Sequence, residues 1–206
     1  ANSGIGFHAS QILARHGAHV IMACRNPSKA EKAKHEIELQ SLKGSVELVS
    51  LDLNSLESVT DFANSMLGRL EHLDCLVNNA GIMMPPYQLT KDGFESQLGV
   101  NHLGHFALTG RLLPLLQQTA NSRVVSVSSI ASNAGKFNFD DLHYKNTKYN
   151  SMLAYGRSKL ANLLFGYELD RKLKAQGSST MSLVVHPGTT TSNLMHYLTE
   201  NRFINL

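Results

Sequence analysis

Three pairs of tyrosine and lysine, each separated by four residues, could support general acid–base chemistry. They are Tyr87 with Lys91, Tyr144 with Lys148, and Tyr155 with Lys159. On a helix this spacing puts both side chains on one face, where the ammonium favours the ionised form of the phenol. Tyr155 opens a long run of leucines at helical spacing, whereas prolines precede Tyr87 and asparagines surround Tyr144, as is typical of loops. The sequence therefore selects Tyr155 and Lys159.

Short apolar runs alternate with longer amphipathic segments along the chain. The apolar runs cover residues 19–24, 46–51, 73–77, 123–127 and 181–185. Such runs are typical of strands buried on both faces of a parallel sheet. Helical patterns run from an Asn26 cap toward Gly44, from Asn54 toward Gly68, and over residues 97–119 and 154–176. This alternation predicts an α/β fold with a Rossmann-type doubly wound parallel sheet.

The composition is that of an ordinary globular domain, because 42% of the 206 residues are hydrophobic and 17% are charged. The formal charge of +3 comes without a block of like charge, so we expect no nucleic-acid partner. Cys24 and Cys75 fall in apolar strand-like runs, which predicts buried reduced thiols and a cytoplasmic protein. The spacing of His102 and His105 does not favour a shared ion, so we expect no metal site.

A glycine-rich turn, residues 1–6, leads directly into a helical pattern. Gly4 and Gly6 would let the backbone approach a pyrophosphate, which the helix N-terminus attracts; a turn that serves only packing is the alternative. In a dinucleotide-binding fold a central strand delivers the first glycine, and no strand pattern precedes Ala1. We therefore expect an excerpt of a longer protein, with the fold truncated at both ends. Membrane association through a segment outside this chain stays open.

The residues at the end of the apolar run 19–24 favour NADP over NAD. An NAD site would place an acidic residue about 20 positions after the glycines, to accept hydrogen bonds from the ribose. This chain has Ala23, Cys24 and Arg25 there. The Arg25 guanidinium could bind a 2′-phosphate in a bidentate manner, and a solvated arginine after a strand is the alternative.

Six short motifs follow one another along the chain, at residues 1–6, 78–81, 101–106, 127–129, 155–159 and 186–188. Their order resembles that of the short-chain dehydrogenase/reductase family over essentially the whole chain. Segments 23–26, 89–93 and 158–162, with the long gap between Ser129 and Tyr155, resemble its retinol-dehydrogenase-like branch and the oxidoreductase domain of WW domain-containing oxidoreductases. The resemblance implies a single NAD(P)-binding domain over residues 1–206, present in part.

The resemblance also implies four catalytic roles. Tyr155 would be the acid in carbonyl reduction and the base in alcohol oxidation, helped by Lys159 because a free phenol titrates near ~10. Ser129 would hydrogen-bond the substrate oxygen, and Asn101 would hold a water that links Lys159 to solvent. Ser129 could instead cap a strand end, and Asn101 could merely interrupt a helix.

Cofactor contacts follow from the same resemblance. Asp52 would accept from the adenine amino group, unless it is only a turn residue before a helix. Lys159 would hold the nicotinamide ribose beside Tyr155. The remaining contacts are Ser3, Gly4, Ile5 and Gly6 at the phosphates, Asn79, Ala80 and Gly81 beside the adenosine, and Pro187, Gly188, Thr189 and Ser192 at the nicotinamide and phosphates.

Together these residues predict an oxidoreductase that transfers a hydride between NADP(H) and an apolar alcohol, aldehyde or ketone. The alternative is a non-catalytic dinucleotide-binding protein with a regulatory or interaction role. Met83, Met84, Pro85 and Tyr87 could line an apolar pocket or belong to the core. Surplus apolar positions on the two longest helices predict a homodimer or homotetramer; they are Leu103, Phe106, Leu112, Leu115, Ala161 and Phe165.

Overall fold

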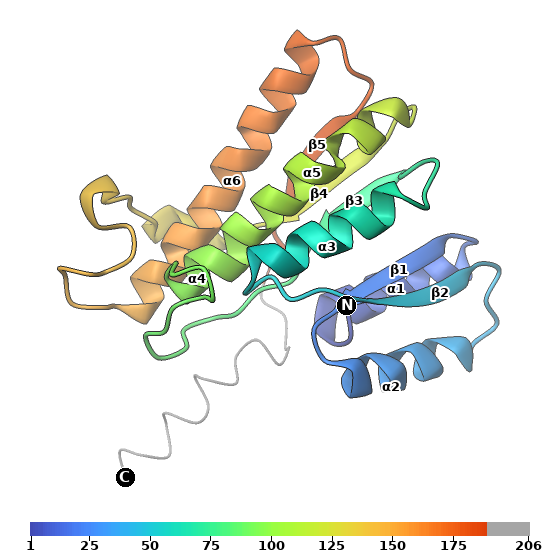
Figure 1. The fold of residues 1–206 in the computed structure, drawn as a ribbon, viewed down its shortest axis with the longest axis horizontal. Coiled ribbons are helices and arrows are strands. Elements are labelled where there is room, and N and C mark those ends of the chain that lie inside the picture. The colour runs from blue at the N-terminus through green and yellow to red at the C-terminus, as the bar shows by residue number, and fades with distance from the viewer. Residues whose placement is uncertain (189–206) are drawn as a thin grey trace.

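Helices and strands alternate along residues 1–188, which are the residues that the computed structural model describes (Figure 1). The strands are β1 (His19–Cys24), β2 (Ser45–Ser50), β3 (Cys75–Asn78), β4 (Arg123–Val127) and β5 (Met181–Val185). The α-helices are α1 (Gly4–Arg15), α2 (Pro27–Glu38), α3 (Leu56–Leu67), α4 (Ser96–Leu98), α5 (Gly104–Gln118) and α6 (Ser151–Ala175). A π-helical segment, η1 (Gly99–Leu103), joins α4 to α5, and two short 3-10 helices, η2 (Ile130–Ala134) and η3 (Phe139–Asp141), follow β4.

The predicted strands are confirmed, while the helices differ at their ends. Asn26 caps α2, since its Oδ1 accepts from the Lys29 N–H at 2.9 Å, but α2 ends at Glu38 rather than near Gly44. Ser55 caps α3 in place of Asn54, because its hydroxyl accepts from the Ser58 N–H. The helical pattern over residues 97–119 is divided into α4, η1 and α5.

Every pair of strands within residues 1–188 is parallel, which confirms the predicted architecture. The ladders fall into two groups within residues 1–188: β1 pairs with β2, and β4 lies between β3 and β5. In Figure 1, α3, α5 and α6 lie side by side along one face of the β3, β4 and β5 group. Polar side chains that follow the strands therefore meet at the carboxyl ends, where ligands bind in open α/β sheets.

Alternate residues of β1 face two separate hydrophobic cores, as a doubly wound fold requires. Met22 and Cys24 pack with α1 and α2. Ile21 and Ala23 pack against the larger core that α3, α5 and α6 build. Burial of both faces explains why β1 reads as a continuous apolar run in the sequence.

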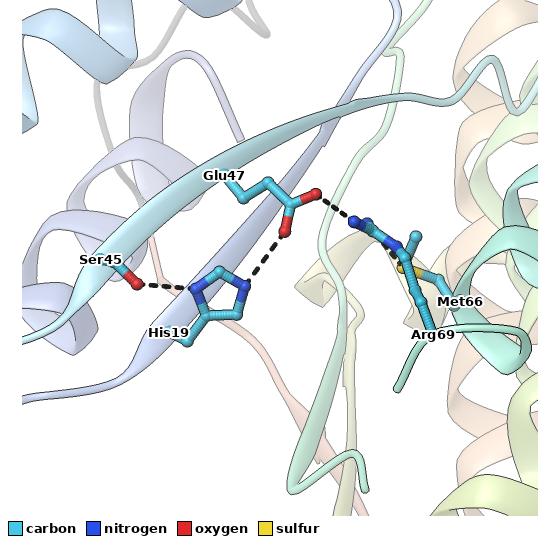
Figure 2. A network of polar contacts seen from close by, with 5 residues as sticks. All are labelled: His19, Ser45, Glu47, Met66 and Arg69. Carbon is cyan, nitrogen blue, oxygen red and sulfur yellow. Dashed lines mark hydrogen bonds and ion pairs between the residues drawn. The ribbon is translucent and has the colours of Figure 1, made fainter. Parts of the chain in front are cut away.

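A polar network ties the β1 and β2 pair to the end of α3 (Figure 2). One oxygen of Glu47 on β2 accepts a hydrogen bond from Arg69, and His19 on β1 lies 3.1 Å from the other oxygen. His19 Nδ1 lies 2.7 Å from the Ser45 hydroxyl. The hydrogen bond from Arg69 lowers the pKa of Glu47 below its ordinary value. This network is partly exposed, so its charges are screened by solvent.

The prediction of two buried thiols is wrong for one of them. Both cysteines are free, but Cys24 is buried whereas Cys75 is exposed. Cys75 shares one face of β3 with Val77, and within residues 1–188 that face is left open to solvent. Among the described helices, none is long and apolar enough to cross a bilayer.

Candidate active site

Tyr155 and Lys159 lie one turn apart on α6 and are both buried, with 6% and 3% of their surfaces exposed. Asn150 caps α6 by accepting from the Leu153 N–H at 3.0 Å, which fixes where the helix begins. The Lys159 Nζ lies 5.8 Å from the centroid of the Tyr155 ring. Tyr87 and Tyr144 lie outside the helices, as the sequence predicted.

Ser129 follows β4 and reaches Tyr155. Its hydroxyl accepts from the Ala131 N–H at 3.2 Å, so it caps η2, and it lies near enough to the Tyr155 phenol to influence its pKa. Burial raises the pKa of Tyr155 above its ordinary value, and Ser129 opposes part of that rise. Ser129 therefore performs the capping task weighed as its alternative and also lies near the predicted acid.

Lys159 is directed at the end of β4. Its Nζ donates to the Val127 carbonyl at 3.0 Å, and burial lowers its pKa to about 8. The lowered pKa predicted for Tyr155 depends on Lys159 together with an oxidised nicotinamide, and in the protein alone burial of the phenol raises its pKa. The cause is the low polarity around the ring, which disfavours the phenolate.

Asn101 is buried in η1, and its side chain joins two distant segments. Its Nδ2 donates to the Ile82 carbonyl and to the Ser158 hydroxyl, both at 2.9 Å, and its Oδ1 accepts from the Ile82 N–H at 2.8 Å. Its backbone carbonyl accepts from His105 Nδ1 at 3.0 Å. The amide thus fixes the segment after β3 against α6.

Two glycines allow the predicted motifs to approach each other. A Cβ atom on Gly81 would lie 3.2 Å from Asn101 Oδ1 and 3.7 Å from Lys159 Nζ. A Cβ atom on Gly6 would lie 2.7 Å from the Asn79 side chain, closer than packed atoms tolerate. The glycine-rich turn therefore contacts the segment after β3, which in turn borders Asn101 and Lys159.

The remaining predicted cofactor residues lie at strand ends. Arg25 is exposed after β1, and Asp52 is half-buried after the neighbouring β2. Asp52 Oδ1 accepts from the Asn54 N–H at 3.0 Å, as a turn residue does. Ser3, Ile5, Ala80, Pro187 and Gly188 are exposed, and Gly4 and Gly188 both have positive φ, at 54° and 71°. Thr189 and Ser192 lie outside the described residues.

Sequence reasoning missed Ser158 and underused His105. Ser158 is fully buried, and its hydroxyl donates to the Tyr155 carbonyl at 2.8 Å while accepting from Asn101. Its position between Tyr155 and Lys159 in the sequence could have marked it as part of the site. We considered His105 only as a metal ligand, but it binds the Asn101 carbonyl, and burial lowers its pKa to about 4.

The residues predicted to line an apolar pocket do not share one environment. Met83 and Met84 are half-buried, Pro85 is buried, and Tyr87 is exposed with its hydroxyl donating to the His143 carbonyl at 2.9 Å. A hollow of about 380 Å³ lies beside Ser129, between η2, α6 and the end of β5; its other lining residues are Ser128, Ile130, Ser132, Asn133, Leu163, Val184, Val185 and His186.

Comparison with known proteins identifies the family. A sequence model of the short chain dehydrogenase family matches residues 1–202. The chain is 46% identical to human retinol dehydrogenase 13 over 194 residues, which are 94% of this chain and 58% of that protein. It therefore spans about three fifths of the length of this curated relative.

Solved structures agree with this assignment. An uncharacterized protein from Mycobacterium paratuberculosis is 49% identical and superposes with a TM-score of 0.82, over 95% of this chain and 68% of that one. A short-chain dehydrogenase from Sphingobium yanoikuyae in complex with NADPH shares the fold, with 20% identity, a TM-score of 0.76, and coverage of 97% of this chain and 72% of that one. The chain belongs to the short-chain dehydrogenase family, on its retinol-dehydrogenase-like branch.

Proposed function

We propose that the protein is an NADP(H)-dependent oxidoreductase that interconverts an apolar alcohol with its aldehyde or ketone. The observation that carries the proposal is the pairing of buried Tyr155 and Lys159 on one face of α6, with Ser129 near enough to the phenol to influence its pKa. A phenol beside a hydroxyl and an ammonium can pass a proton to or from a substrate oxygen. Residues 1–206 would form one cofactor-binding domain, present in part.

The residues present fit a dinucleotide. Gly4 has a positive φ, which suits a tight turn, and the N-terminus of α1 that follows it favours a pyrophosphate. Residues 3–6 would hold the phosphates, and Asp52 with Asn79 and Ala80 would border the adenosine. Pro187, Gly188, Thr189 and Ser192 would contact the nicotinamide end, and Lys159 its ribose. When bound, the nicotinamide supplies or accepts the hydride.

Arg25 supports NADP over NAD. It is exposed at the carboxyl end of β1, and residues 23–25 include no carboxylate that could accept from ribose hydroxyls. An arginine fork suits the doubly charged 2′-phosphate of NADP. The NADPH named for the Sphingobium relative is consistent with this choice.

In the reduction direction, Tyr155 donates its proton to the carbonyl oxygen as the carbon gains the hydride; alcohol oxidation reverses both transfers. Ser129 holds the substrate oxygen by a hydrogen bond beside the phenol. Lys159 stabilises the phenolate that remains after proton donation. The Asn101 side chain holds Ile82 against Ser158 on α6. The water-holding role of Asn101 stays a prediction, since its amide groups bond Ile82 and Ser158 and its backbone carbonyl accepts from His105.

The substrate is proposed to be apolar on two grounds. The chain is 46% identical to human retinol dehydrogenases 13 and 11, whose name specifies an apolar alcohol. Half-buried Met83 and Met84 follow directly on the segment that contacts Asn101 and would give that side of the site a flexible apolar wall.

A homodimer through α5 and α6 is also proposed. Leu112, Leu115 and Ala161, which we expected on the outer face, are buried within the subunit, so that part of the expectation is wrong. Phe106, Leu164 and Tyr167 are among the exposed apolar side chains of these helices, and Phe106 packs on Phe165 with ring centroids 5.5 Å apart. A second copy could cover them, and a homotetramer would pair two such dimers.

The test is direct. The full-length protein is mixed with NADPH or NADH and a panel of apolar aldehydes and ketones, and cofactor oxidation is followed by absorbance. Turnover with NADPH that disappears in Tyr155→Phe supports the proposal. Tight NADPH binding without turnover of any substrate in the panel would favour the non-catalytic binding protein instead.

A further inference from the structure

The segment after β3 contains a strained residue beside the catalytic cluster. Met84 has a φ of 54°, in the left-handed region that residues with a side chain rarely occupy. It comes two positions after Ile82, whose backbone N–H and carbonyl both bind the Asn101 amide. Such a conformation persists only where neighbouring groups hold it. The groups that bind Met84 therefore define the path of the backbone after β3.

Gln97 is the residue that holds Met84. Its Oε1 accepts from the Met84 N–H at 2.9 Å. Its Nε2 donates to the Tyr149 hydroxyl and to the Ser151 carbonyl, both at 2.8 Å. The side chain is fully buried, and both of its Nε2 protons have partners. A buried amide satisfied in this way has one favourable position.

These bonds join three segments that are far apart in the sequence. Met84 belongs to the loop after β3, Tyr149 to the long loop after β4, and Ser151 is the first residue of α6. Tyr155 follows Ser151 by one helical turn. Gln97 therefore fixes the distance between Met84 and the start of the helix that carries the proposed acid.

Tyr87 and Tyr144, the other two tyrosines considered as acids in the sequence, pack beside the residues that Gln97 binds. The Tyr149 ring lies 5.2 Å from that of Tyr87 and 5.1 Å from that of Tyr144, between ring centroids. Buried Glu95 accepts from the Tyr149 hydroxyl at 3.2 Å. Arg157 covers the Tyr144 ring at 4.5 Å. Tyr87 and Tyr144 thus pack against the ring of Tyr149, whose hydroxyl accepts from Gln97.

We propose that Gln97 is a positioning residue that sets the substrate side of the site by holding Met84 in its left-handed conformation against the start of α6. The effect on substrate binding rests on the proposed function. The hydrogen bond by which Gln97 holds Met84 is independent of that function. Without Gln97, Met84 leaves its left-handed conformation, and the protein binds bulky apolar substrates more weakly. The cofactor contacts proposed above lie at Gly81 and the glycine-rich turn, so cofactor affinity should change little.

The experiment uses the full-length protein carrying Gln97→Leu. The expected result is a KM increase of about tenfold for a long-chain aldehyde, a smaller change in kcat, and a nearly unchanged NADPH affinity. Hydrogen exchange at the Met84 amide should accelerate by roughly tenfold or more. Tyr149→Phe is the matched control, since it keeps the Gln97 bond to Met84 and should not accelerate that exchange.

Met84→Gly tests whether the left-handed conformation of residue 84 is the cause of the KM change. Glycine adopts a positive φ without strain, so Gln97→Leu should raise KM less when residue 84 is glycine than when it is methionine. If the leucine variant does not fold, Gln97→Asn keeps a buried amide whose shorter reach breaks the same bonds. Wild-type KM together with a protected Met84 amide in either folded variant would overturn the inference. An inactive wild-type protein would refute the proposed function, while the exchange data would still decide whether Gln97 holds Met84.

Discussion

The Lys159 ammonium donates its hydrogen bond to the Val127 carbonyl, 3.0 Å away, although the Tyr155 ring centroid lies 5.8 Å from the same nitrogen. The end of β4 thereby fixes the lysine beside the phenol. Asn162 Nδ2 donates to the same carbonyl at 3.3 Å. A buried ammonium held in this way can stabilise a phenolate without a direct bond to it, because the Coulomb interaction is strong where water is excluded.

Tyr155→Phe should reduce turnover by roughly 10²-fold or more, since it removes the proposed acid and keeps the ring. NADPH affinity should stay close to that of the wild type. Tyr87→Phe and Tyr144→Phe serve as matched controls, and neither should abolish the acid–base step. Steady-state turnover and NADPH titration of the three variants provide the check. Retention of wild-type turnover by Tyr155→Phe, where chemistry limits the rate, would disprove the mechanism.

Lys159→Ala should lower both turnover and NADPH affinity, because one side chain is assigned to the phenol and the ribose. Its pKa of about 8 adds a pH dependence. Below that pH the ammonium is charged and can stabilise the phenolate; as the pH rises through about 8 it loses the proton, so the reduction rate should fall. Lys172→Ala, an exposed change on the same helix, is the control. An effect on turnover without any effect on cofactor binding would remove the ribose assignment.

Arg25→Ala should weaken NADPH binding by about 10- to 100-fold and NADH binding far less, since a charge-assisted bidentate contact is lost only with the 2′-phosphate. The measurement is a titration of each variant with both cofactors. Arg15→Ala removes an exposed arginine at the end of α1 and should change neither affinity. Equal weakening of both cofactors by Arg25→Ala would contradict the NADP assignment.

His105 should make the folded state less stable in mild acid. Its folded pKa of about 4 lies below the ordinary 6.5, so between these values the unfolded chain binds a proton that the folded chain excludes. Stability is fully present above about 6.5 and declines as the pH falls, by about 2 kcal/mol between pH 7 and pH 5.

Urea unfolding of the full-length protein at these two pH values measures the effect of His105. His105→Asn removes the titration while placing an amide near the Asn101 carbonyl, and it should shrink the difference in unfolding free energy. His35→Asn, at an exposed position in α2, should shrink it less. A wild-type difference in His105→Asn would show that other groups cause the acid sensitivity.

Tyr167→Glu and Phe106→Glu should shift a dimer toward monomer, because each buries a charge in the proposed interface without changing the core of the subunit. Sedimentation velocity at micromolar concentration reads the association state. Leu39→Glu, at a more exposed apolar position in the segment after α2, should leave that state unchanged. A wild-type protein that sediments as a monomer would rule out the dimer.

The sequence by itself determined the elements and the choice of Tyr155. The limits of β1, β4 and β5, the Asn26 cap of α2, and the helix that carries Tyr155 and Lys159 all depend on residues within a few positions of one another. Apolar periodicity and capping are local, so they can be recognised without knowing the fold. The motif order further linked these elements to one family.

Only the tertiary structure decided which side chains meet. Gln97 binds Met84, Tyr149 and Ser151, which lie 13, 52 and 54 residues away, and Asn101 binds Ser158 across 57 residues. The exposure of Cys75 and the upward shift in the Tyr155 pKa likewise depend on what distant segments cover. Buried polar groups take the partners that packed elements bring within reach, and no local pattern encodes that reach.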